Sequence, residues 1–439
     1  MQTKLDRISE IAKNDGKCRF KNLMHLLNRD NLKDCFHRLR KDSAAGIDSV
    51  TWQEYASNLD EHLDDLVARM KQWSYRPQPV RRLYIPKGDG RMRPPGIPAI
   101  EDKVVQIAIA RILTAIYETD FMDFSYGFRP GKSGHDAIER LDYMIKWNRV
   151  NYVLDADIKG FFDNMNHKWM VRMLEERVSD PHLLRLLKRF LKNGYLEDGI
   201  LHDTVQGTPQ GGIVSPVLAN IYLHYVLDLW FDKVVRKHTK GFVGIVRYAD
   251  DYVICAQYKH EAEAILDALT KRLGKFSLSL AENKTKLIRF GRFAEEKARR
   301  QGKKAGTFDF LGFTHYNDKD RKGGFKVGRK TARKKFTAKA RDLKLWLKKA
   351  RNVKPQIWWS ILCAKLRGHY QYYGVSGNYR GVMRYYRLAV RLLYKWLNRR
   401  SQKRSMNWIQ FQAYLQKYPL PTPRICRNLY VNHSYSGEC

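Results

Sequence analysis

Two adjacent carboxylates, Asp250 and Asp251, lie between two apolar, β-branched runs in the segment "GFVGIVRYADDYVICA". The runs predict two strands joined by a tight turn, with the acidic pair at its tip. In a solvated turn such residues need no special explanation, because Asp is common in turns. Here the flanking runs predict burial, where unpaired negative charges are costly, so a bound cation is the alternative interpretation.

A second acidic position closes another strand of the buried type. The run "NYVLDADIKGFFDN" places Asp155 and Asp157 on one face at period two, and Asp163 follows shortly after. If this strand and the Asp250–Asp251 hairpin are neighbours in one antiparallel sheet, their carboxylates converge on a site for hard divalent cations. Two Mg²⁺ ions about 3.5–4 Å apart can activate a hydroxyl and stabilise a leaving pyrophosphate. The residues alone leave Asp155, Asp157 and Asp163 as alternatives.

The composition indicates a folded protein with a polyanionic partner. Of the 439 residues, 44% are hydrophobic, and 82 Lys and Arg oppose 45 Asp and Glu, which gives a net charge of +37. Such an excess points to nucleic acid. No apolar run of about 18 residues and no signal-peptide core is present, so we expect a cytoplasmic protein without membrane contact. The six cysteines show no CxxC spacing, which predicts reduced thiols rather than a zinc site or disulfides.

Periodicity and turn residues predict the elements before residue 290. We expect helices over 5–70, a hairpin with a basic tip over 77–98, an amphipathic helix over 101–118, a loop and then a helix over 127–141, further helix to 191, and a Gly/Pro loop followed by an apolar helix over 205–228. Strands alternate with helices in this part without an internal repeat. The pattern predicts a mixed helix and sheet domain.

The composition changes after Arg289. Runs such as "RKGGFKVGRKTARKKF" between residues 297 and 351 are nearly without acidic residues and predict a basic linker. Aromatic residues, Arg and Leu then recur at helical spacing from Trp358 to Trp396, which predicts a helical module. The Pro-rich tail after Tyr418 predicts little regular structure.

Several longer motifs carry a resemblance to a known family. The sequence has "YADD" at 248–251, "DIKGFFDN" at 157–164 and "QGTPQGGIVSPVLANIYL" at 206–223. Further matching segments are "YIPKGDGRMRPPGIPAIEDKVVQ" at 84–106, "GFRPGKSGHDAI" at 127–138, "NKTKLIRFG" at 283–291, "FDFLGF" at 308–313, "LRGHYQYYGVSGN" at 366–378 and "WLNRRSQ" at 396–402. Over nearly its full length the chain resembles the group II intron reverse transcriptases with maturase activity.

The resemblance implies roles for the acidic and pocket residues. Asp157, Asp250 and Asp251 match the family's catalytic metal ligands, which selects Asp157 among the three alternatives. The implied cofactor is a pair of Mg²⁺ ions, with Mn²⁺ as a substitute. Phe162 matches the aromatic gate that clashes with a 2′-hydroxyl, although it could equally be a core phenylalanine. Gln210 matches a residue that lines the nucleotide pocket, and the glycines around it allow close backbone approach.

Three basic residues match the family's contacts to the triphosphate of the incoming nucleotide. Lys87 and Arg93 in the fingers hairpin resemble its triphosphate ligands, as suits an ammonium and a forked guanidinium. A solvated basic pair at a hairpin tip is the alternative interpretation. Lys284 matches a lysine near the pyrophosphate that could act as an acid, and Lys286 is equally near in sequence.

The implied fold class is α+β, a right-hand polymerase with an α-helical thumb. The expected domains are fingers and palm with a small antiparallel sheet at 1–320, a helical thumb or maturase domain at 321–403, and a short DNA-binding segment at 404–439. In the thumb, aromatic and basic residues either clamp an RNA–DNA duplex or pack in the core: Arg367, Tyr370, Tyr372, Tyr373 and Arg384.

Two departures from the family pattern concern the fingers and the end of the chain. Pro95 replaces the leucine usual in the "RPxGIP" box, which stiffens the loop but leaves its charged residues in place. The Cys and His spacing supplies no HNH-type endonuclease, so we expect the endonuclease-lacking class C type.

The implied function is RNA-directed DNA polymerase, together with binding of intron RNA to assist splicing. The expected partners are group II intron and template RNA, a DNA primer or target, and deoxynucleoside triphosphates. One alternative is a domesticated reverse transcriptase in host repair or defence. Another is an RNA-binding splicing factor with a vestigial polymerase site. Clustered carboxylates are costly to retain without a chemical role, which argues against the second alternative.

Overall fold

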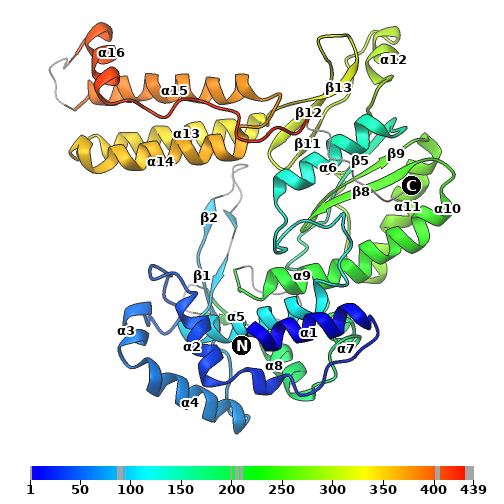
Figure 1. The fold of residues 1–439 in the computed structure, drawn as a ribbon, viewed down its shortest axis with the longest axis vertical. Helices are drawn as coiled ribbons and strands as arrows, with labels where there is room; N and C mark the ends of the chain where they lie inside the picture. Colours follow the sequence, from blue (N-terminus) through cyan, green and yellow to red (C-terminus); the bar gives the residue numbers. More distant parts are fainter. Residues whose placement is uncertain are drawn as a thin grey trace. The chain divides into compact units, whose positions relative to one another are not determined.

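The computed structural model describes residues 2–86, 92–93, 95–197, 200–202, 207, 211–400 and 406–430 (Figure 1). The chain divides into two compact units. The first unit contains residues 1–137 and 154–287, and the second contains residues 138–153 and 288–439. The divisions fall within α6 (Gly134–Trp147), β5 (Tyr152–Asp157) and β10 (Lys286–Arg289), so the predicted boundary at residue 320 remains a proposal about domains.

The first unit opens with the helices predicted for residues 5–70. They are α1 (Gln2–Asn14), the short 3-10 turn η1 (Met24–Leu26), α2 (Arg29–His37), α3 (Trp52–Ser57) and α4 (Leu59–Lys71). Asn28 and Thr51 cap α2 and α3 by accepting backbone N–H bonds. The apolar faces of α1 and α2 pack on a further helix, α5 (Ile100–Tyr117).

The predicted helix over 101–118 is confirmed as α5, but the amphipathic pattern expected for it is wrong. Even Asp102 and Lys103 are buried, because α1, α2 and α9 (Ser215–Leu223) all pack on α5. Burial raises the pKa of Asp102 to about 7, although the Tyr75 O–H and the Gln78 N–H donate to this carboxyl. The charged residues therefore point into the unit rather than to solvent.

The predicted fingers hairpin is confirmed where it is described. Strand β1 (Val80–Arg82) pairs antiparallel with β4 (Gly96–Ile97), and β2 (Ile85–Pro86) pairs antiparallel with β3 (Met92–Arg93). On its other side β1 pairs parallel with β6 (Tyr195–Glu197), which is followed by β7 (Ile200–His202). The tip of the hairpin, residues 87–91, lies outside the described residues.

A four-stranded sheet carries both acidic motifs. Its order is β10 (Lys286–Arg289), β5 (Tyr152–Asp157), β9 (Asp251–Ala256) and β8 (Val243–Tyr248). Strands β8 and β9 form the predicted antiparallel hairpin, with Tyr248 opposite Asp251. The prediction that the two strands with the acidic motifs are neighbours in one sheet is confirmed, because β5 lies directly beside β9.

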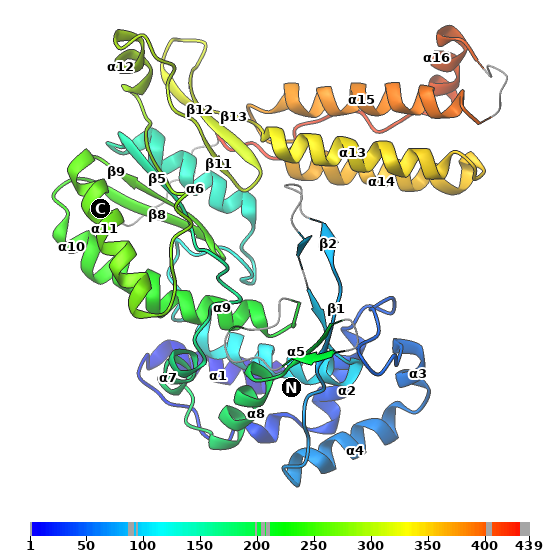
Figure 2. The same cartoon turned by 180° about the vertical axis from the view of Figure 1, so that it is seen from behind.

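Further helices complete the first unit (Figure 2). They are α7 (His167–Glu175), α8 (Pro181–Leu191), α9, α10 (Arg236–His238) and α11 (Lys259–Lys275), while α6 (Gly134–Trp147) lies mostly in the second unit. Helix α9 does not end at Leu223 but continues through two π-helical turns, His224–Asp228 and Phe231–Val235. Such turns insert an extra residue and often occur at functional sites.

The predicted basic linker over 297–351 is wrong. In the second unit this stretch forms α12 (Ala294–Arg300), a three-stranded antiparallel sheet of β11 (Phe308–Phe310), β12 (Phe313–Lys319) and β13 (Phe325–Thr331), and the first part of a helical layer. Phe308, Phe310 and Phe313 are buried. The dense Lys and Arg residues between them hid this apolar pattern.

The predicted helical module is confirmed as α13 (Arg333–Ala350), α14 (Pro355–Tyr373), α15 (Tyr379–Leu397) and α16 (Trp408–Lys417). Tyr370 and Tyr373 are buried in its core, so the packing alternative holds for them, whereas Tyr372 is 39% exposed. Residues 418–430 form neither helix nor strand, as predicted, apart from a single bridge between Val375 and Arg427. None of the described helices is long and apolar enough to cross a membrane.

Candidate active site

The acidic pair lies at a two-residue turn whose backbone is under strain. Ala249, the first residue of the turn between Tyr248 and Asp251, has φ of 57°. A left-handed conformation costs a residue with a side chain roughly 1–2 kcal/mol. It persists only where the surrounding structure enforces it. Contacts behind the turn must therefore hold Ala249 and the following Asp250 in place.

One of these contacts is the backbone of Gly127. A Cβ atom at this glycine would lie 2.3 Å from the Ala249 nitrogen and 2.9 Å from the Tyr248 carbonyl carbon. Real carbon contacts are about 3.5 Å or longer. The loop and the turn therefore approach as closely as they do because residue 127 has no side chain.

A second contact comes from Arg247, which is fully buried on β8. Its Nη1 donates 3.0 Å bonds to the Ala249 carbonyl and to the side-chain oxygen of Asn220. Its Nε donates a 2.7 Å bond to Asp228, which is also fully buried, and its Nη2 bonds to the same carboxylate. The buried charge is thus compensated, and the carbonyl that precedes Asp250 has a fixed partner.

Asp157 is the last residue of β5, the strand next to β9 in the sheet. The neighbouring Tyr252 is fully buried, and burial raises the pKa of Tyr252, with the nearby Asp157 carboxylate adding to the effect. The Ala281 N–H donates to the Asp157 carbonyl at 2.8 Å, and this backbone pairing brings the Lys284 ammonium into an ion pair with the Asp157 carboxylate. Of the two lysines weighed from sequence, Lys284 reaches Asp157, whereas Lys286 begins β10 as an exposed residue.

Phe162 lies next to Gly207, a residue of the nucleotide-pocket motif. Its ring is partly buried and packs edge-on against Phe161 at 5.4 Å. Gly207, with φ of 88°, is so close that a Cβ atom there would lie 2.8 Å from the Phe162 carbonyl oxygen. The backbones of Gly207 and Phe162, the predicted gate, are therefore in close contact, and this approach needs the absence of a side chain at residue 207.

Three predicted nucleotide contacts are not defined by the structure. Lys87 and Gln210 lie outside the described residues. For Arg93 only the backbone is described, as part of β3. Their predicted roles remain predictions.

The oxygen donors suit a hard divalent cation, but they do not form a complete protein cage. Among the described residues, three or more His, Cys, Asp or Glu side chains nowhere gather closely enough to hold a metal ion. Mg²⁺ is commonly bound by one or two carboxylates together with substrate phosphates and water, so a complete cage is not required. The Asp157 carboxylate, a predicted metal ligand, forms an ion pair with the Lys284 ammonium, so a cationic group already lies at this position.

Comparison with known proteins decides the family. The family model described as "Reverse transcriptase (RNA-dependent DNA polymerase)" matches residues 85–315, more than half of the chain, including both acidic motifs. This chain belongs to the reverse transcriptase family. The resemblance to the family and the α+β fold class are thereby confirmed. Members of this family generally use divalent metal ions.

Relatives connect this reverse transcriptase with group II introns. It is 32% identical over 304 residues to the group II intron-encoded protein LtrA of Lactococcus lactis subsp. cremoris, covering 66% of the chain and 50% of LtrA. It is 31% identical over 315 residues to protein YkfC of Escherichia coli (strain K12), covering 64% of the chain and 83% of YkfC. A shorter match, 27% identical over 131 residues, is with nuclear intron maturase 3 of Arabidopsis thaliana, covering 29% of the chain and 17% of that protein. The chain spans about half the length of LtrA.

Sequence analysis missed the residues behind the turn. Arg247 is a charged residue inside the apolar run "FVGIVRY", and a buried charge requires a buried partner. This pattern could have identified Arg247 from the sequence. Asp228 in the apolar stretch "HYVLDLW" carries the same signal. Their pairing across separate elements was visible only in the folded chain.

Proposed function

We propose that this reverse transcriptase is an RNA-directed DNA polymerase whose active site is formed by Asp157, Asp250 and Asp251. The observation that carries the proposal is that the strained acidic turn leads into β9, and that Asp157 ends the neighbouring strand β5 close to Tyr252 of β9. Two Mg²⁺ ions bound to these carboxylates and to nucleotide phosphates would supply activation of the primer hydroxyl and stabilisation of the pyrophosphate. Mn²⁺ is expected to substitute for them.

In the proposed reaction the primer 3′-oxygen attacks the α-phosphorus of a deoxynucleoside triphosphate, and the bond to pyrophosphate breaks. The ion pair between Lys284 and Asp157 supports a role for Lys284 in neutralising charge there. Phe162 would exclude a 2′-hydroxyl from the nucleotide site by steric contact. Lys87 and Arg93 would hold the triphosphate, and Gln210 would line the base pair.

We further propose that the chain binds group II intron RNA and assists its splicing. The names of its relatives and the net charge of +37 support an RNA partner. Residues 1–320 would form fingers and palm, 321–403 the thumb or maturase domain, and 404–439 a DNA-binding segment. The relatives do not favour a host-domesticated enzyme or a splicing factor with a vestigial polymerase site.

Primer extension on an RNA template tests the polymerase proposal. The intact protein should make cDNA with Mg²⁺ and deoxynucleotides, and the Asp250→Asn, Asp251→Asn variant should make none while RNA binding is unchanged. The matched control is Asp64→Asn, Asp65→Asn, which removes two adjacent charges from exposed positions of α4 and should leave extension intact. Intact protein that binds RNA but makes no cDNA would support the splicing-factor alternative instead.

A further inference from the structure

The motif "GFRP" at 127–130 has no part in the proposed chemistry, yet it lies behind the acidic turn. The Gly127 carbonyl accepts a 2.7 Å bond from the side-chain nitrogen of Asn220, which is 1% exposed. The same Asn220 accepts from Arg247, which in turn donates to the Ala249 carbonyl. One chain of hydrogen bonds thus runs from the motif to the turn.

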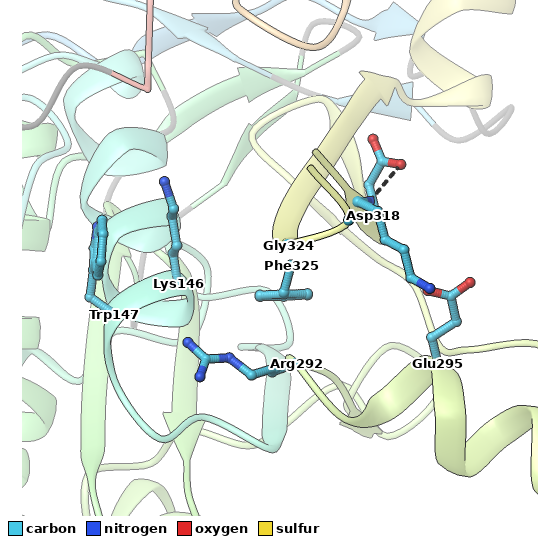
Figure 3. A pocket seen from close by; sticks show the side chains of 9 residues that line it. Lys146, Trp147, Arg292, Glu295, Asp318, Gly324 and Phe325 are labelled. Atoms are coloured by element: carbon cyan, nitrogen blue, oxygen red, sulfur yellow. Dashed lines mark hydrogen bonds between the residues drawn. The ribbon is translucent and has the colours of Figure 1, made fainter. Parts of the chain in front are cut away.

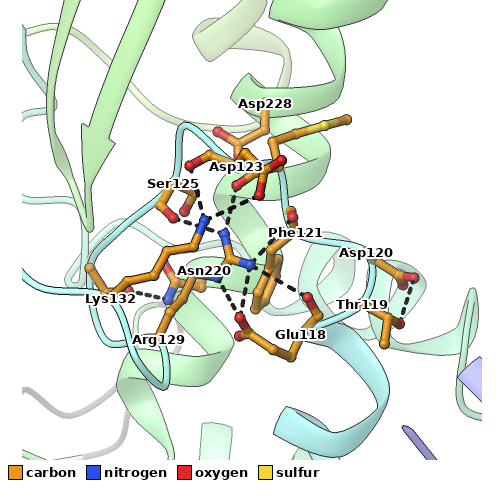
Figure 4. Close-up of polar contacts among 12 residues, drawn as sticks. Glu118, Thr119, Asp120, Phe121, Asp123, Ser125, Arg129, Lys132, Asn220 and Asp228 are labelled. Atoms are coloured by element: carbon orange, nitrogen blue, oxygen red, sulfur yellow. Dashed lines mark hydrogen bonds and ion pairs between the residues drawn. The ribbon is translucent and has the colours of Figure 1, made fainter. Parts of the chain in front are cut away.

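Arg129 holds the loop that precedes the motif. Its guanidinium donates to the carbonyls of Met122 at 2.6 Å and Ser125 at 2.8 Å, and to Glu118 at 2.9 Å (Figure 4). The loop then pairs with β8, because the Tyr126 N–H donates to the Arg247 carbonyl at 2.8 Å. Arg129 therefore fixes a loop that contacts Arg247 through the backbone.

The π-helical turn after α9 explains how one helix supplies two partners to Arg247. In an uninterrupted α-helix, Asn220 and Asp228 would lie about 80° apart around the axis. The extra residue of the π turn His224–Asp228 brings them to within about 20°. Both side chains then face the same guanidinium, as their hydrogen bonds require.

We propose that Gly127, Arg129, Asn220, Asp228 and Arg247 form a backing frame for the acidic turn, with Arg247 as its positioning residue. The frame fixes the peptide between Ala249 and Asp250, and so sets where the two carboxylates point. This inference rests on the proposed polymerase function for its catalytic consequence, although the mechanical role of the frame is independent of it.

The test removes both buried charges together, because deleting one alone would leave the other uncompensated. The variant is Arg247→Met, Asp228→Leu. Amide hydrogen exchange of the peptide 248–252 should become at least tenfold faster. In single-nucleotide extension, kcat should fall about 100-fold, as expected for a displacement of about 1 Å. The Mg²⁺ concentration for half-maximal rate should rise, while the KM for primer–template stays unchanged.

A matched control is Arg329→Met, Asp142→Leu, which removes another buried ion pair in the second unit. It should change neither the exchange of 248–252 nor kcat. Should the first double variant fail to fold, Asn220→Leu cuts the link to Gly127 without changing charge and should raise exchange of the same peptide. Unchanged turn exchange in a folded variant would overturn the frame. A wild-type protein without extension activity would instead refute the polymerase proposal, and exchange would still decide the frame.

A separate observation in the second unit concerns a cavity of about 490 Å³. We call it the Trp147 pocket; its lining includes Lys146, Trp147, Arg292, Glu295, Asp318 and Phe325. Trp147 is 57% exposed, an unusual state for this residue type. Figure 3 shows Trp147, Lys146 and Arg292 gathered on one side of the pocket, with Glu295 and Asp318 on the other.

We infer that the Trp147 pocket takes one unpaired nucleotide of a nucleic-acid strand. An exposed indole offers a stacking face for any base. Lys146, whose Nζ lies 4.8 Å from the indole centroid, and Arg292 supply positive charge for the adjoining phosphate. The carboxylates opposite can accept bonds from exocyclic amino groups of the base. A duplex cannot present an unstacked base, so the pocket selects single strands.

The test measures the affinity of the full chain for a 12-nucleotide single-stranded RNA, the same sequence as DNA, and a blunt-ended RNA duplex. High salt suppresses the background from the remaining positive charge. Trp147→Ala should weaken single-strand binding about tenfold and leave duplex binding unchanged, whereas the control Tyr258→Ala, at another exposed aromatic residue, should change neither. The RNA and DNA arms show which strand the pocket prefers. Equal affinity of Trp147→Ala and wild type for both single strands would overturn the inference.

Discussion

Replacement of Gly127 by alanine tests the contact between the "GFRP" loop and the acidic turn. The added Cβ would lie 2.3 Å from the Ala249 nitrogen, 2.9 Å from the Tyr248 carbonyl carbon and 3.0 Å from the Ala249 Cα. All three are backbone atoms, so no flexible side chain can swing away. Either the loop or the turn must move by about 1 Å to restore ordinary contact distances.

The magnitude follows from this displacement. Overpacking of a well-packed region costs about 1–3 kcal/mol, and the lower entropy of the unfolded alanine chain returns about 0.4–1 kcal/mol. We therefore expect a net loss of about 1–2 kcal/mol in the free energy of unfolding. A shift of about 1 Å in catalytic carboxylates is expected to lower the extension rate about 100-fold. Activity should thus fall much more than the folded fraction does.

The assay combines urea unfolding with single-nucleotide extension under conditions where the variant is fully folded. Gly274→Ala in α11 is the matched control, because no atom lies within 4 Å of its added Cβ. Removing a helical glycine there should leave the rate unchanged and stabilise the protein slightly. A Gly127→Ala protein with wild-type stability and rate would refute the close approach of loop and turn, and with it this account of the motif.

Three further outcomes are expected. Burial raises the pKa of Asp102 to about 7 in the folded protein, whereas the pKa of an unfolded Asp is near 4. The stabilisation by Asp102 is therefore fully present below about pH 4 and is lost as the pH rises through 7, which lowers the free energy of unfolding by about 4 kcal/mol. In urea unfolding, Asp102→Asn, which cannot ionise, should not show this decrease. Lys284→Met should slow primer extension, whereas Lys286→Met, at an exposed position, should not; equal rates in both variants would contradict the role given to the Asp157 ion pair. RNA affinity should fall roughly 10³-fold or more between 50 and 200 mM salt in a binding titration, and an affinity independent of salt would exclude phosphate contacts as its main source.

Local patterns predicted most elements of the first unit. Apolar, β-branched runs predicted β5, β8 and β9, and the turn between the last two, because residue type and turn chemistry are local properties. The same approach failed over 297–351, where the basic residues predicted a linker but the chain forms the sheet of β11–β13. Lys and Arg fit on the outer face of a strand because their aliphatic stems can lie along the sheet while their charged ends reach solvent. It also failed for the surroundings of α5, since a helix packed on several sides can bury charged residues that a single amphipathic face would expose.

By itself the sequence determined the acidic motifs, their strands, the family resemblance and the polyanionic partner, since each depends on residue type and short-range spacing. Only the tertiary structure decided which residues hold the turn. Gly127, Asn220, Asp228 and Arg247 come from separate segments, and a π turn sets which helix side chains face the guanidinium. The choice of Lys284 as the partner of Asp157 likewise depends on backbone pairing between distant segments. Such contacts arise when the chain folds back on itself, and no local period encodes them.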